Sequence, residues 1–418
     1  MTRAGTETPA EIATELQDDR LIRSEGLSGA IRGFGLRVRG GDLGSLPVVV
    51  GLIVIWAVFQ ILNPNFLSAN NLVNLTLQCA AVGTISIGIV LVLLLGQIDL
   101  SVGSVSGLAA AIFGVAFTEL HWDPTVAVLA ALLAGAAIGL LYGLLFTRFG
   151  VPSFVITLAG LLGFLGLQLW VLGANSSLNI PYDSWIVQFA QQMFLPPWAA
   201  YALGALAALS MFFSDWRRAG RRRRAGLSEG SVTVMLIKAL LLLVALELSA
   251  WYLSTDRGTG AMFVFFVLLV IVMNVFLTRT RWGRSVFAVG GSVEAARRAG
   301  IRVNRVYISV FMLCSTFAAL GGLLAAARLT SVNASSGGTD VNLNAIAAAV
   351  IGGTSLFGGR GSAWSALLGI LVIQSISSGL TLLNLDSSIR FMITGAVLVL
   401  AVIIDSLSRR SRASHGQA

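Results

Sequence analysis

The sequence is short of charge, of lysine, of histidine and of cysteine, and each shortage excludes a class of protein. Only 11% of the 418 residues are charged, against about a quarter in a soluble domain, so a soluble globular protein is excluded. The single lysine, Lys238, lies inside an apolar stretch. A phosphate-binding loop needs lysine directly before serine or threonine, so the chain has no such loop and does not hydrolyse ATP by itself.

Histidine and cysteine occur twice each, as His121, His415, Cys79 and Cys314. The cysteines lie in apolar segments, fit neither a metal spacing nor a disulfide framework, and are predicted to fill space in the core. Ser355 would need a base to act as a nucleophile, and neither histidine is in a segment expected to reach it. The chain is therefore predicted to bind no metal or cofactor and to be no enzyme.

What the sequence has instead is apolar length, with 56% hydrophobic residues and a mean hydropathy of +0.85. A membrane-crossing helix needs about 20 apolar residues. The pattern predicts an all-α integral membrane protein, a polytopic helical bundle of about 12 transmembrane segments. The predicted segments are 46–62, 72–95, 101–117, 125–146, 154–173, 198–213, 232–253, 262–277, 306–327, 343–357, 362–383 and 389–404. No cleavable signal peptide is expected before the first of them.

The arginines give this bundle an orientation. If the N-terminus is cytoplasmic, 24 of the 27 arginines fall in inner segments, as the positive-inside rule requires. This predicts a cytoplasmic segment at 1–45, a transmembrane domain at 46–405 and a cytoplasmic tail at 406–418. Within the domain, 214–231 is a basic cytoplasmic hairpin, expected to touch anionic lipid rather than nucleic acid.

Two stretches, starting at Gly96 and at Asn344, mix glycine, serine and threonine with short apolar runs. Broken or re-entrant helices of transporters have this composition. The first contains Asp99, for which two roles stay open. It can cap the helix expected from Val102, with Ser101 beside it, or it can carry a proton within the membrane. The second role would favour an ion- or proton-coupled secondary carrier.

The loop at 279–305 contains a short helix with both ends specified. Ser292 is a good N-cap, Glu294 suits the positive end of the helix dipole, Arg297 and Arg298 suit the negative end, and Gly300 can close the helix in a left-handed conformation. A helix this short is not stable alone in water. Such a rigid projection on a membrane protein predicts a docking point for a soluble partner, where the small Ala295 and Ala296 are expected to approach the partner most closely.

Four stretches resemble, in order, the permeases of ABC sugar importers in the branched-chain amino acid and ribose/xylose group. Residues 283–301 look like that family's cytoplasmic coupling loop, and 98–103, 343–359 and 151–160 are similar to three further signatures. The excursion 198–253 is typical of xylose-type members and absent from ribose-type ones. Ser292 replaces a more common asparagine, and Phe357 a smaller residue.

The resemblance implies the permease subunit of an importer for a monosaccharide, D-xylose or a similar sugar, in the bacterial inner membrane with both termini cytoplasmic. It implies as partners a second permease copy in a homodimer, cytoplasmic ATP-binding subunits that hold ATP-Mg, and a periplasmic sugar-binding protein. The ATPase-coupling residues would be Gly290, Gly291, Ser292, Val293, Glu294, Ala295, Ala296, Arg297, Arg298 and Gly300. The candidate path for a neutral sugar consists of Gln78, Gln97, Asp99, Ser101, Thr157, Gln168, Asn344 and Thr354.

Overall fold

The computed structural model describes residues 46–173, 176–224 and 231–386, with scattered positions between 388 and 403. Eight of the described helices are long and apolar enough to cross a membrane, and three shorter apolar helices accompany them. The chain is thus an all-α, multi-pass membrane protein, as predicted. The predicted segment at 389–404 falls mostly outside the described residues.

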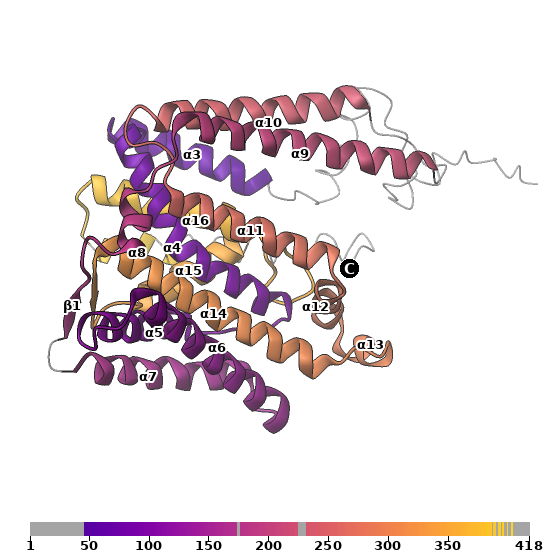
Figure 1. Ribbon diagram of the computed structural model, residues 1–418. Helices are drawn as coiled ribbons and strands as arrows, with labels where there is room; N and C mark the ends of the chain where they lie inside the picture. The colour runs from indigo at the N-terminus through magenta and orange to yellow at the C-terminus, as the bar shows by residue number, and fades with distance from the viewer. Residues whose placement is uncertain are drawn as a thin grey trace, which may run out of the picture. The chain divides into compact units, whose positions relative to one another are not determined.

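The chain divides into two compact units. The larger unit, Gly44–Phe194 with Thr259–Ser406, contains most of the elements drawn in Figure 1. These are α3 (Leu46–Leu62), α4 (Ala69–Leu94), α5 (Val102–Thr118), α6 (Pro124–Phe149), α7 (Ser153–Leu172), β1 (Ser177–Asn179), α8 (Trp185–Val187), the π-helical turn η2 (Gln188–Gln192), α11 (Ala261–Arg279), α12 (Arg281–Gly291), α13 (Val293–Arg298), α14 (Val303–Leu329), β2 (Ser331–Asn333), α15 (Thr339–Ile351) and α16 (Trp364–Leu382). The described part of the smaller unit is a pair of helices, α9 (Pro197–Arg224) and α10 (Val232–Leu253).

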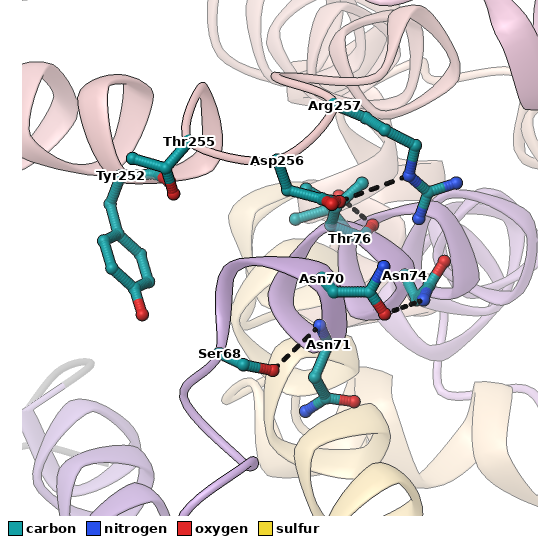
Figure 2. Close-up of polar contacts among 10 residues, drawn as sticks. Ser68, Asn70, Asn71, Asn74, Thr76, Tyr252, Thr255, Asp256 and Arg257 are labelled. Atoms are coloured by element: carbon teal, nitrogen blue, oxygen red, sulfur yellow. Dashed lines mark hydrogen bonds and ion pairs between the residues drawn. The ribbon is translucent and has the colours of Figure 1, made fainter.

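Helix α4 is the centre of the larger unit, packed against α14, α16, α15 and α11. Its first turn is capped by Ser68, whose Oγ accepts from the Asn71 N–H at 3.4 Å (Figure 2). Nearly every residue from Cys79 to Leu94 is buried. A helix that is apolar on all sides needs neighbours on all sides, and α4 has them.

Helices α6 and α14 pack closely through small residues. A Cβ placed at Gly135 would lie 2.6 Å from Ala319 Cβ, and one at Gly143 would lie 2.7 Å from Ile308 Cα. Glycine therefore lets these backbones touch, which is how helices associate in lipid without a hydrophobic driving force. Helix α14 packs against α4 as well as against α6.

The helices are broken at the two predicted places. Seven residues, 95–101, separate α4 from α5. Twelve residues, 352–363, separate α15 from α16. The predicted segment 343–357 therefore starts four residues late and runs six residues past the end of α15. The reason is local, because Gly353, Gly358, Gly359 and Gly361 all have positive φ angles that a helix cannot use.

A short antiparallel ribbon joins the ends of two helices. Ser177, after α7, pairs with Asn333, after α14, and Leu178 pairs with Val332. At the start of α6, Asp123 Oδ1 accepts from the Thr125 N–H at 2.8 Å, and hydrogen bonding to the side chain and the backbone of Thr125 lowers the pKa of the Asp123 carboxyl.

In the smaller unit, α9 and α10 pack against each other. Helix α9 continues to Arg224, so the basic run predicted as part of a hairpin is helical. On the same helix, Asp215 and Arg218 form an ion pair of 3.8 Å. After α10, Asp256 and Arg257 form an ion pair of 3.3 Å (Figure 2). The residues between Arg224 and Ser231 are outside the described part of the chain.

Candidate coupling surface and translocation path

Two short helices, both capped at their first turn, follow α11 and are separated by Ser292 alone. Thr280 caps α12 by accepting from the Gly283 N–H at 3.1 Å, and Ser292 caps α13 by accepting from the Ala295 N–H at 3.3 Å. At the far end, Gly300 (φ 80°) donates to Arg297 O and Ile301 donates to Ala296 O. This pair of bonds is the Schellman closure of a helix. Both ends of α13 are therefore as predicted from Ser292 and Gly300.

Helix α12 was not predicted, since 283–291 was expected to be loop. Trp282, Val286 and Val289 follow helical spacing and turn towards the protein, and Trp282 Nε1 donates to Ser309 Oγ of α14 at 2.8 Å. Thr280 before this stretch is a usable N-cap signal. The apolar spacing and the cap together could have revealed the helix.

Helix α13 presents one polar face outward. Glu294 and Arg297 pair at 3.4 Å while their side chains stay 70% and 62% exposed. Ala295 and Arg298 are exposed as well. Ala296, by contrast, is only 3% exposed. The prediction that Ala296 meets a partner is wrong, because α13 rests on the protein through this residue and the half-buried Val293 and Ile301.

The remaining residues of the predicted coupling set are on the preceding turn. Gly291 and Ser292 are exposed, and Gly290 is half-buried. In the larger unit, α12 and α13 lie at the end where α4, α6 and α11 finish (Figure 1). Arg148 and Arg279 occupy the last turns of α6 and α11, so several arginines gather at this end.

Asp99 belongs to a buried polar cluster at the start of α5. The residue is 1% exposed, and its Oδ1 accepts from the Ser101 N–H at 2.8 Å and from Ser101 Oγ at 2.7 Å. Tyr142 of α6 donates to Ser101 Oγ at 2.8 Å, and Cys314 Sγ of α14 lies 3.7 Å from Asp99 Oδ2. Among the described residues, no ion pair involves Asp99. Its carboxyl group is thus in contact with the backbone and hydroxyl of Ser101 and the thiol of Cys314.

The geometry bears on the cap predicted for α5. Ser101 is the N-cap residue by backbone position, yet its hydroxyl makes no capping bond to the helix. Asp99 instead accepts from the N–H of Ser101, one residue before the helix begins. The carboxylate thus secures the entry to α5 without bonding an amide inside it.

Three members of this site were not predicted. Tyr142 and Cys314 come from α6 and α14, far from Asp99 in sequence. Asn342, which is 3% exposed, donates through Nδ2 to Leu100 O at 2.5 Å, whereas the predicted Asn344 is half-buried nearby on α15. The only sequence signal for Tyr142 is a hydroxyl in an apolar span between Gly139 and Gly143.

The other path candidates do not all gather at this cluster. Thr157 Oγ1 donates to Ser153 O at 3.0 Å and lies 3.5 Å from Ile98 O, beside the cluster. Gln168 is fully buried elsewhere, donating through Nε2 to Asn333 O and Ser336 O at 3.1 and 2.9 Å. Gln78 and Gln97 are half-buried, and Thr354 is buried in the loop after α15.

The described residues contain no group of three or more His, Cys, Asp or Glu able to hold a metal ion. The chemistry available at the buried sites is hydrogen bonding by hydroxyl, amide and carboxylate groups. Such groups suit a ligand that carries hydroxyls and no charge.

Known proteins resemble the chain over most of its length. Residues 71–402 match the family model described as branched-chain amino acid transport system, permease component. The xylose transport system permease protein of Escherichia coli (strain K12) is 33% identical over 82% of this chain and 87% of its own. Its counterpart in Haemophilus influenzae is 33% identical over 87% and 96%, and the ribose import permease protein of E. coli (strain K12) is 31% identical over 86% and 92%. No solved structure matches this chain.

Proposed function

The chain belongs to the permease-component family of branched-chain amino acid transport systems, and from this premise we propose that it translocates a neutral monosaccharide in an ATP-driven importer. D-xylose or a similar sugar is the proposed substrate, since the relatives are named for xylose and ribose import. The observation that carries the proposal is α13, a capped helix with an exposed, charged face, which follows α12, a helix with one buried apolar face.

The proposed partners follow from this surface and from the family. Two cytoplasmic ATPase subunits, which hold ATP-Mg, would dock on the exposed face of α13, one on each of two permease copies. A periplasmic binding protein would deliver the sugar to the opposite side. The inner membrane, cytoplasmic termini and contact of Arg221, Arg222, Arg223 and Arg224 with anionic lipid belong to the same proposal.

The proposed cycle begins when ATP binding draws the ATPases together. Their movement would displace α13 and α12, and the spans would open a polar path alternately to each side. A sugar in that path would exchange hydroxyl hydrogen bonds with half-buried amides such as Gln78, Gln97 and Asn344. ATP would supply the energy, so this cycle includes no proton relay.

The test is uptake into proteoliposomes that contain the permease and its partner subunits. We expect D-xylose uptake to require ATP and the binding protein and to persist after a protonophore is added. Vesicles without ATP, with and without an imposed pH gradient, are the controls. Uptake driven by the gradient in the absence of ATP would instead assign the chain to the secondary carriers.

A further inference from the structure

Gly290, near the end of α12, lies directly on the backbone of two other segments. A Cβ added there would overlap the carbonyl oxygen of Leu94, at the end of α4, and would lie 2.8 Å from the nitrogen of Gly359. The Gly359 N–H itself donates to Leu94 O at 2.9 Å. Real Cβ atoms do not approach other atoms this closely, so α12 reaches its position because Gly290 has no side chain.

Gly358 and Gly96 complete the contact. A Cβ at Gly358 would lie 2.7 Å from Gly290 O and 2.9 Å from Gly96 N, and one at Gly96 would lie 3.3 Å from Phe357 O. We call Gly96, Gly290, Gly358 and Gly359 the glycine junction. Three segments meet there backbone to backbone, namely the end of α4, the end of α12 and the loop after α15.

The junction connects the coupling helices to both broken segments. Ser292 alone separates α12 from α13. On the other side, Gly96 opens the segment that leads through Asp99 to α5, and Gly358 lies in the loop that leads to α16. No side chain stands between these backbones to absorb a displacement by changing rotamer, and closely packed interiors transmit strain.

We propose that the glycine junction transmits movement of α13 to segments 95–101 and 352–363, with Gly290 as its central positioning residue. The inference rests on the function proposed above, because it gives the route by which an ATPase docked on α13 would act on the path. It predicts that a side chain added at the junction lowers transport more than ATP hydrolysis. The exposed face of α13, where the ATPase would dock, is left unchanged.

The chain offers a matched pair of variants for the test. Gly290→Ala places a methyl group against Leu94 O, whereas at Gly163 of α7, outside the coupling set, a Cβ would meet nothing within 4 Å. Both changes add the same methyl group to a helix. In complexes reconstituted with the ATPases and binding protein, we expect Gly290→Ala to lower D-xylose uptake about tenfold or more, within the range of a coupling free energy. Copurification of the ATPases should match Gly163→Ala, and ATP hydrolysis should fall much less than uptake.

A second pair of variants, with less steric overlap, covers the case in which the Gly290→Ala protein does not accumulate. Gly96 and Gly150 have φ angles of 69° and 68°, a conformation that asparagine tolerates. A Cβ at Gly96 would be tightly placed against Phe357 O, while one at Gly150 would meet nothing within 4 Å. We expect Gly96→Asn to lower the amount of sugar carried per ATP hydrolysed, and Gly150→Asn to leave that ratio at the wild-type value.

The outcomes separate the two proposals. Wild-type complexes that take up no sugar with ATP would refute the proposed function. Wild-type complexes that transport normally, with Gly290→Ala equal to Gly163→Ala, would overturn the junction alone. Where Gly290→Ala is not recovered, equal ratios in Gly96→Asn and Gly150→Asn would overturn it.

Discussion

The Tyr142 hydroxyl donates to Ser101 Oγ at 2.8 Å, and the Ser101 hydroxyl donates in turn to Asp99 Oδ1 at 2.7 Å. This chain of bonds fastens the start of α5 to α6. We expect Tyr142→Phe to destabilise the protein by about 1 kcal/mol, the net value of one buried hydrogen bond. Thermal unfolding in detergent measures it, with Tyr182→Phe as the control because Tyr182 is 59% exposed. Equal unfolding temperatures for the two variants would remove Tyr142 from this role.

Asp99→Asn distinguishes the two roles left open for this residue. Asparagine keeps an oxygen that can accept from the Ser101 N–H and hydroxyl, so a role in holding the entry to α5 predicts a cost of about 1 kcal/mol or less. Asp99→Ala removes the acceptor and should cost about 1–3 kcal/mol, since Ser101 is then left buried without it. We expect uptake by Asp99→Asn to stay near wild type, measured in proteoliposomes. Abundant, folded Asp99→Asn that transports nothing would show that the charge itself is required.

Glu294→Arg tests the coupling surface. The change puts a positive charge at the positive end of α13, at a cost of about 0.3–1 kcal/mol, too little to prevent insertion. We expect copurification with the ATPase, and the ATP hydrolysis that follows from it, to drop sharply. Glu119→Arg makes the same change at an exposed residue after α5 and should bind the ATPase normally. ATPase binding that is equal in both variants would contradict docking on α13.

Ala295 and Ala296 are adjacent in sequence, but the first is exposed and the second is buried. A large side chain is therefore expected to impair ATPase binding at Ala295 and protein stability at Ala296. Ala296→Trp forces a large ring beneath α13 and should destabilise the protein by about 1–3 kcal/mol or more through overpacking. Ala295→Trp adds the same ring to an exposed face, so the protein should accumulate normally while ATPase binding falls. Expression level, thermal unfolding and copurification measured side by side decide this. Normal stability of Ala296→Trp would contradict the burial of Ala296.

The sequence predicted features whose cause is local. Ser292 and Gly300 mark the ends of α13 because capping depends on a few neighbouring residues. The two helix breaks were predicted for the same reason, through composition. Helix α12 was missed because its amphipathic pattern is short, and the inward direction of Ala296 depends on how α13 rests on the protein. Each of these last two features is set by tertiary packing.

The polar cluster could not be predicted from spacing. Asp99 meets a hydroxyl from α6 and a thiol from α14, and only the packed arrangement of these helices brings them together. Cys314 was predicted to be core filler, and its burial agrees, but its position beside Asp99 has no sequence signal. The eight candidate path residues do not form one cluster, since Gln168 bonds a different segment, and their place on a path stays a prediction.

The break between α4 and α5 has a consequence for how the interior is solvated. Backbone groups released from a helix inside a membrane have no water to bond and must find partners in the protein. Asn342 is the hydrogen-bonding partner of Leu100 O, and Asp99 is that of the Ser101 N–H. Thr157 lies near Ile98 O. These side chains take the place of water as hydrogen-bonding partners of the backbone between α4 and α5. The segment can therefore change conformation while its backbone groups keep hydrogen-bonding partners, provided that these side chains move with it.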